Sequence, residues 1–114
     1  GEGLYAAFVG EIGETAARAL ADHVDDPMKA CILALYRSAV TVGAEWQPAV
    51  DALGAARPAA VLWGRDDPFA PFRFGERLAA RVGAELVALD AAHFWPAQRP
   101  VEAAAALERL WARG

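Results

Sequence analysis

The spacing of hydrophobic residues changes near Pro58 and divides the chain into two parts. Before this proline, apolar residues recur every three or four positions, for example at Leu4, Phe8 and Ile12. Such spacing places one apolar stripe along a helix, so it predicts a helix over about residues 3–22.

The remainder of the first part carries further helix signals. Asp26 is a candidate N-cap, Pro27 suits the first helical position, and Gly43 is expected to end this helix. Cys31 lies within the apolar pattern, which favours a buried and unreactive thiol. A short helix is predicted over about residues 46–53. The first part is therefore predicted to be entirely helical.

After Pro58, short unbroken apolar runs alternate with helical spacing. Runs that are apolar on both faces are typical of strands in a parallel sheet covered by helices. The predicted elements are a strand at 59–63, a helix at 74–82, a strand at 84–90 and a helix from Pro100. A right-handed crossover makes such strands parallel and brings their carboxyl ends to one edge of the sheet, where ligands bind in α/β proteins.

The composition narrows the class of partner. The 114 residues are 56% hydrophobic and 23% charged, with a net charge of -4 and no cluster of Lys or Arg. This composition lacks the basic surface that nucleic acid or an anionic membrane requires. No apolar run approaches the roughly 18 to 20 residues of a membrane-spanning helix, and no targeting segment is recognisable. We expect a cytoplasmic protein with a small-molecule substrate, no nucleic acid partner and no membrane partner.

Two residues with complementary chemistry follow the two predicted strands. Asp67 comes after the first strand and His93 after the second. A carboxylate that accepts a hydrogen bond from one imidazole nitrogen fixes the tautomer and orientation of the ring, so that the other nitrogen can act as a base. We interpret Asp67 and His93 as a catalytic pair, and the neighbouring Asp66 as a turn or helix cap.

The segments around these residues resemble the C-terminal part of the α/β-hydrolase family. They read "RPAAVLWGRDDPFAP", then "AELVALD", then "AHFWPAQRPVEAAAALERLW", within residues 57–111. In that family the triad acid lies three residues after a strand-ending glycine, which corresponds to Gly64 and Asp67 here. The triad histidine follows the last strand, as His93 does. One departure is Ala92, where the family usually has glycine.

The resemblance implies a fold and a domain organisation. The implied fold class is α/β, with the C-terminal βαβα portion of an α/β-hydrolase parallel sheet preceded by a helical cap-like segment. The cap or lid would comprise residues 1–55 and the core portion residues 56–114.

The family's nucleophile is missing from the chain. It lies on a G-x-S-x-G turn, and no such motif is present. The one serine, Ser38, lies on a predicted helix, where its hydroxyl is expected to bond a carbonyl one turn back. Cys31 is not a good substitute. We therefore expect a fragment that needs a missing N-terminal half, or a second copy of the chain, to supply the nucleophile.

Aromatic residues near the predicted site are candidates for a substrate pocket. These are Tyr36, Trp46, Phe69 and Trp95. Tyr36 has a second possible role, because family members that open epoxides use cap tyrosines as proton donors. Trp95 could either shield His93 from water or pack under the last helix, and the sequence does not decide between these alternatives.

The resulting prediction is a hydrolase of the esterase, epoxide hydrolase or dehalogenase type that acts on a small apolar substrate. The complete protein would be an enzyme, whereas the 114 residues alone would not. No cofactor is implied, and no metal is expected, because the acidic residues near His23 are better explained as a solvated helix junction. The alternative is a non-catalytic α/β module that binds a partner chain through an exposed sheet edge. In either case we expect the isolated chain to swap, dimerise or aggregate.

Overall fold

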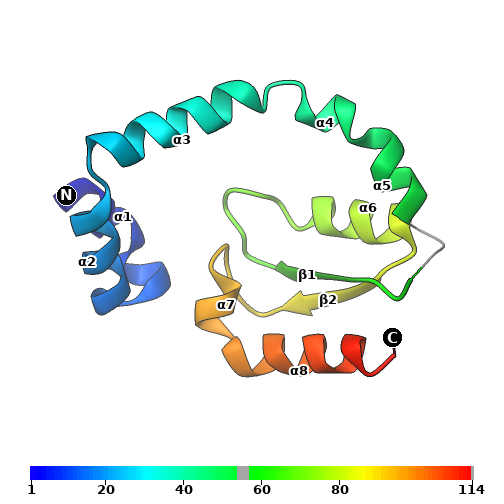
Figure 1. Cartoon of the computed structure of the whole chain (residues 1–114). Coiled ribbons are helices and arrows are strands. Elements are labelled where there is room, and N and C mark those ends of the chain that lie inside the picture. Colours follow the sequence, from blue (N-terminus) through cyan, green and yellow to red (C-terminus); the bar gives the residue numbers. More distant parts are fainter. Residues whose placement is uncertain (54–56, 114) are drawn as a thin grey trace. The chain divides into compact units, whose positions relative to one another are not determined.

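Figure 1 shows the computed structural model of the protein, which describes residues 1–53 and 57–113. The chain forms two compact units, Gly1–Gln47 and Pro48–Gly114, which are described separately below as unit 1 and unit 2. The predicted domain boundary between residues 55 and 56 lies outside the described residues.

Unit 1 is helical. Its helices are α1 (Glu2–Ile12), α2 (Glu14–His23), α3 (Asp26–Ser38) and α4 (Val42–Glu45), and α5 (Gln47–Leu53) begins at its end. The prediction of one helix over 3–22 is wrong, because Gly13 has φ 80° and ψ 164° and separates α1 from α2. Glycine adopts this backbone conformation without the steric penalty that other residues incur. The hydrophobic spacing continues across this break, so the pattern alone did not reveal it.

The ends of α3 differ from the prediction. The N-cap is Asp25, not Asp26: its backbone is extended, and its Oδ1 accepts a hydrogen bond of 2.8 Å from the Met28 N–H. The helix ends at Ser38, and the predicted stop Gly43 lies inside α4 instead. Cys31 is exposed, so the prediction of a buried thiol is also wrong.

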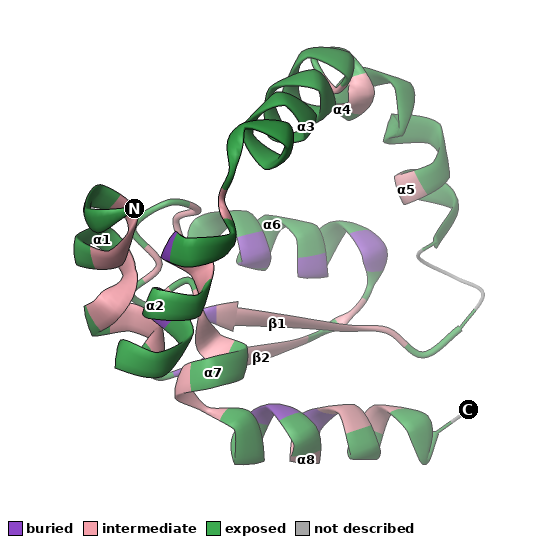
Figure 2. Cartoon of the chain, turned by 60° about the vertical axis from the view of Figure 1, so that its left-hand side comes forward, coloured by how far each residue is buried: buried purple, intermediate pink, exposed green. Residues whose placement is uncertain are grey.

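Unit 2 contains a small parallel sheet between helices. Strands β1 (Ala60–Gly64) and β2 (Glu85–Leu89) pair in register from Ala60 opposite Glu85 to Gly64 opposite Leu89. Unit 2 also contains α5 from Pro48 onward and the helices α6 (Arg73–Val82), α7 (Trp95–Gln98) and α8 (Pro100–Trp111). Both α6 and α8 pack against the strands, and the buried residues of these two helices lie on the sides that face the sheet (Figure 2).

Neighbouring residues of β1 point to opposite faces of the sheet, as the alternation of a strand requires. The Trp63 indole packs on Gly75 of α6, where an added Cβ would lie 2.8 Å from the ring. Leu62 packs instead against a core that includes Leu89 of β2 and Ala103 of α8. The core of unit 2 therefore depends on both helices.

The predicted fold class is wrong. The described residues are 65% helix and 9% strand, with one two-stranded parallel sheet, rather than the βαβα portion of an α/β-hydrolase sheet. The two strands do pair in parallel across α6. A run that is apolar on both faces predicts a covered strand but does not indicate how many strands join it, which explains the error. None of the described helices is long and apolar enough to cross a membrane.

Candidate acid-base site

The loops that follow the two strands are joined by backbone hydrogen bonds. The Arg65 N–H donates to the Leu89 carbonyl at 2.9 Å, and the Asp66 N–H donates to the Ala91 carbonyl at 3.1 Å. Gly64 permits this approach, because a Cβ at that position would lie 2.2 Å from the Ala92 carbonyl oxygen. The close contact fixes the two loops against each other at the carboxyl ends of the strands.

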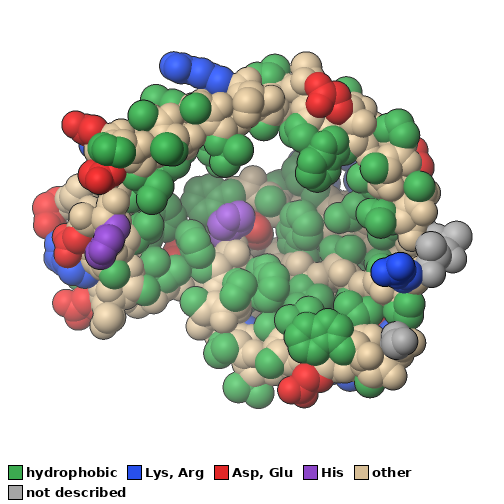
Figure 3. Space-filling view, viewed as in Figure 1, with side chains coloured by type: hydrophobic (Ala, Val, Ile, Leu, Met, Phe, Trp, Pro, Cys, Tyr) green, Lys and Arg blue, Asp and Glu red, His purple; other side chains and the backbone are tan. Residues whose placement is uncertain are grey.

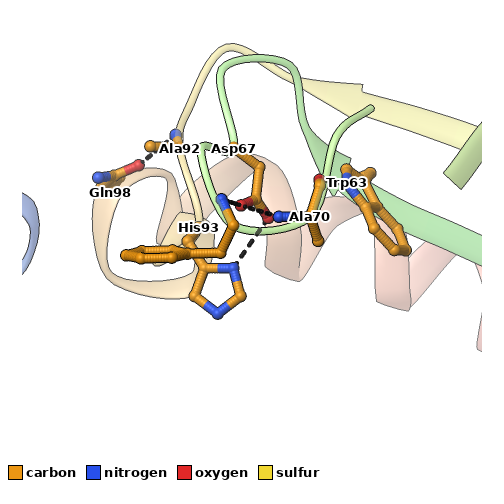
Figure 4. A network of polar contacts seen from close by, with 7 residues as sticks. Trp63, Asp67, Ala70, Ala92, His93 and Gln98 are labelled. Carbon is orange, nitrogen blue, oxygen red and sulfur yellow. Dashed lines mark hydrogen bonds and ion pairs between the residues drawn. The ribbon is translucent and has the colours of Figure 1, made fainter. Parts of the chain in front are cut away.

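Asp67 is held by its own loop. Its Oδ1 accepts hydrogen bonds from the Phe69 N–H at 2.9 Å and the Ala70 N–H at 2.8 Å. The Ala70 carbonyl in turn accepts a hydrogen bond of 2.8 Å from the Trp63 indole, so the strand anchors the loop (Figure 4). This arrangement orients the carboxylate and leaves Oδ2 for another donor.

That donor is His93. The distance between His93 Nδ1 and Asp67 Oδ2 is 2.9 Å, and the side chains are 43% and 5% exposed, respectively. The structure therefore brings together the two residues that the sequence analysis paired. The carboxylate is almost fully enclosed, while the imidazole is accessible to a ligand.

The protonation state of Asp67 assigns the imidazole tautomer. Burial, the largest single influence, raises the pKa of the Asp67 carboxyl group, but its hydrogen bonds and the nearby imidazole together outweigh burial and lower that pKa below its usual range. At neutral pH Asp67 is therefore a carboxylate and can only accept hydrogen bonds. It follows that His93 donates through Nδ1–H, and that Nε2 carries the lone pair when the ring is neutral.

The loop of His93 is fixed by α7 and by aromatic contacts. The Ala92 N–H donates to Gln98 Oε1 at 2.7 Å. The rings of Phe69 and Phe94 meet the imidazole edge-on, with centroid distances of 5.1 and 5.3 Å. No described residue other than glycine has a positive φ, so the backbone at Ala92 is not in the left-handed region that favours glycine.

A small cavity lies beside the pair. Its volume is about 170 Å³, and it is lined by Leu62, Trp63, Asp67, Ala70, His93 and Trp95. Trp95 was a predicted pocket residue, whereas Leu62, Trp63 and Ala70 were missed. Their apolar side chains follow the strand pattern and carry no sequence signal that separates a lining residue from a core residue.

The other predicted pocket residues lie elsewhere. Phe69 is 64% exposed, and its ring contacts that of His93, but Phe69 is not among the residues that line the cavity. Tyr36 and Trp46 belong to unit 1 and are also exposed.

Neither of the other candidate groups forms a second centre. The Ser38 hydroxyl donates to the Leu35 carbonyl at 2.8 Å, as predicted for a serine within a helix. His23 Nδ1 lies 2.7 Å from the Ala19 carbonyl, which occupies that nitrogen. In the part of the chain that the structure describes, no three His, Cys, Asp or Glu residues are grouped to hold a metal ion.

Comparisons with protein-family models, with curated proteins and with solved structures find no match for this chain. The chemistry of the site is therefore inferred from its geometry.

Proposed function

We propose that Asp67 and His93 form the acid-base pair of a site that hydrolyses a small ester or a chemically related bond. The observation that carries this proposal is the 2.9 Å contact between Asp67 Oδ2 and His93 Nδ1. It orients an accessible imidazole with its second nitrogen free to take a proton, as a general base requires.

In the proposed reaction, His93 Nε2 removes the proton of an attacking hydroxyl as the oxygen bonds to the carbonyl carbon of the substrate. The Asp67 carboxylate stabilises the imidazolium that forms. The imidazolium then returns the proton to the leaving oxygen as the bond to that oxygen breaks. Each transfer uses the same nitrogen, so the ring does not need to turn.

The attacking group is a serine hydroxyl, or a water that opens an ester formed on an aspartate. Ser38, the one serine of the sequence, already donates to its own helix. We therefore propose that the serine or aspartate belongs to a missing part of the complete protein, or that a second copy of the chain supplies the aspartate. The complete protein is accordingly the proposed enzyme.

An activated ester tests the pair in this chain without that group. Imidazole can attack 4-nitrophenyl acetate, releasing a coloured product, and the sequence has two histidines, His93 and His23. In a Cys31→Ser background, which removes the exposed thiol as a competing nucleophile, we expect His93→Ala to lower the protein-dependent rate at least about tenfold. Asp67→Asn should lower it comparably by favouring the wrong tautomer. The matched control His23→Ala should change the rate less than about twofold, since no carboxylate orients that ring. Equal rates for the wild type and His93→Ala would refute the proposal.

The second candidate function is association with a second copy through β1, and it is supported by a difference between the two sheet edges. Edge strands are commonly protected by charged residues. The ends of β2 carry ion pairs, Glu85–Arg113 at 2.6 Å and Asp90–Arg99 at 3.9 Å. In contrast, β1 consists of five uncharged residues, and among the described residues no strand pairs with the edge of β1 that faces away from β2.

Proline can test this edge without breaking the sheet. The Ala59 carbonyl accepts a hydrogen bond from the Glu85 N–H, and the Leu89 carbonyl accepts one from the Arg65 N–H. Because the N–H groups of a strand point alternately to its two sides, those of Ala60 and Ala88 point away from the partner strand. We expect light scattering to show a dimer for the wild type and a monomer for Ala60→Pro. Ala88→Pro, the matched change on β2, should remain dimeric. A monomeric wild type would exclude this candidate.

A further inference from the structure

The cavity beside His93 has the size of one aromatic ring. Its volume is about 170 Å³. An apolar cavity of about 150 Å³ in another protein binds benzene, so this pocket has room for a group of that size.

The lining favours an uncharged ligand. Leu62, Trp63, Ala70 and Trp95 contribute carbon-rich surface, and the lining contains no Lys or Arg. The lining contains one carboxylate, that of Asp67, whose two oxygens already accept three hydrogen bonds. The Asp67 carboxylate would repel a ligand carboxylate. A ligand ammonium would find only one remaining lone-pair position, on Oδ2 of a side chain that is 5% exposed.

His93 supplies a polar atom that can orient the ligand. In Figure 4 the His93 ring directs Nδ1 toward Asp67 and the opposite nitrogen, Nε2, away from it. The imidazole is itself part of the cavity lining. Nε2 is therefore the atom that a hydroxyl or ester oxygen of a bound group has to reach.

We infer that this cavity binds a neutral group of the size of a benzene ring, with an oxygen next to it that hydrogen-bonds to or reacts at His93 Nε2. This inference rests on the proposed function and names its substrate class: esters in which a phenyl or benzyl group, or an alkyl group of similar size, adjoins the bond that is cleaved.

Benzyl alcohol is the probe, and the four tryptophans of the wild-type chain are the reporters. Trp63 and Trp95 line the cavity, whereas Trp46 and Trp111 do not. In ¹H–¹⁵N spectra, benzyl alcohol should shift the first two indole signals and the His93 Nε2 signal with one common, saturable dissociation constant in the millimolar range. The other two indole signals should not move. Shifts of equal size at all four indoles, or shifts that do not saturate, would overturn the inference.

Related probes test size and charge on the same sample. Benzoate, benzylammonium and 2-naphthalenemethanol should each bind at least about tenfold more weakly than benzyl alcohol. Equal binding of either charged probe would refute the neutral assignment, and equal binding of the naphthyl probe would refute the size.

A substitution that fills the cavity provides a further test. Ala70→Leu adds volume to the lining but keeps the backbone groups that bond Asp67 and Trp63. It should abolish the benzyl alcohol shifts, while the exposed control Ala112→Leu should retain them. If Ala70→Leu does not fold, the probe series on the wild type still decides the question.

The two proposals can fail separately. Saturable benzyl alcohol binding combined with ester hydrolysis that does not depend on His93 would leave the cavity assignment standing and refute the acid-base role. Hydrolysis that depends on His93 without benzyl alcohol binding would refute the substrate class and retain the acid-base role.

Discussion

Unit 1 and unit 2 both form helices with hydrophobic stripes, but they bury these stripes to different extents. In unit 1 the buried hydrophobic residues are Ala17 and Ala21. All residues of α3 are exposed, and hydrophobic side chains lie at the surface along this helix (Figure 3). Unit 2 buries larger side chains, including Val82 and Leu89, around its sheet.

The difference shows that local signals and tertiary packing are separate requirements. The N-cap at Asp25 and the helical spacing specify α3 within a short segment of chain. In unit 2, residues distant in sequence must meet, as in the bond from Arg65 to Leu89. Substitutions in unit 2 should therefore affect folding strongly, and comparable substitutions in unit 1 weakly.

The largest expected effect is that of Gly64→Ala. Its Cβ would lie 2.2 Å from a backbone oxygen that cannot move without separating the two loops. We expect a loss of about 3 kcal/mol in the free energy of unfolding of unit 2, measured by urea titration of Trp fluorescence. In unit 1, Gly10→Ala meets nothing within 4 Å and should instead increase helicity slightly. A tolerated Gly64→Ala would show that the loops are not in close contact.

The next largest effect is expected for Asp67→Asn, and it depends on pH. The pKa of the Asp67 carboxyl group is lower in the folded protein than in the unfolded chain. At a pH between these two pKa values, the folded state therefore binds fewer protons than the unfolded state. The resulting stabilisation is complete above the unfolded pKa of about 3.9 and is lost as the pH falls through the folded value. Asp67→Asn should cost about 2 kcal/mol at neutral pH, because a carboxylate with three hydrogen bonds is replaced, and the cost should shrink in acid.

Urea titrations at a series of pH values would measure this dependence. The matched control is Asp66→Asn, since the structure records no side-chain hydrogen bond for Asp66 among the described residues. The control should follow the wild-type curve. An Asp67→Asn curve that runs parallel to the wild type down to strong acid would contradict the role given to the carboxylate.

A smaller effect is expected for Trp63→Phe, which keeps the aromatic packing but removes the indole N–H donor. The Ala70 loop would lose its anchor to β1, at a cost of about 1 kcal/mol. The pKa of the Asp67 carboxyl group should rise toward its usual value, because the Ala70 N–H is held less firmly against it. Carbon NMR of this carboxyl group would measure the change. Trp95→Phe, in the same cavity but without a recorded indole hydrogen bond in the described structure, is the control.

Hydrophobic spacing predicted most of the helices and both strands, because these depend on local periodicity. It failed where the backbone conformation of one residue ends a helix. At Gly13, a positive φ divides a continuous apolar pattern into two helices. It also failed for the sheet, because the number of strands depends on long-range pairing that no local window contains. The predicted α/β-hydrolase sheet portion was wrong for this reason.

The site was predicted in part. Asp67 and His93 could be paired because parallel strands place the loops after them at one edge of the sheet, and the structure confirms that contact. The support from Trp63 and Gln98 could not be predicted, because it depends on hydrogen bonds to the backbone of Ala70 and Ala92. Such bonds leave no pattern of residue types.

The smallest expected effect is that of truncating the exposed stripe of α3. Leu35 is 66% exposed, so Leu35→Ala removes little buried surface and should change the free energy of unfolding by less than about 0.5 kcal/mol. The same truncation at Leu89, which is 4% exposed, should cost about 3 kcal/mol. Circular dichroism during thermal unfolding would measure both changes. A loss above about 1 kcal/mol for Leu35→Ala would mean that the stripe on α3 is covered in solution, and the contrast between the two units would then reflect a missing partner rather than a difference in packing.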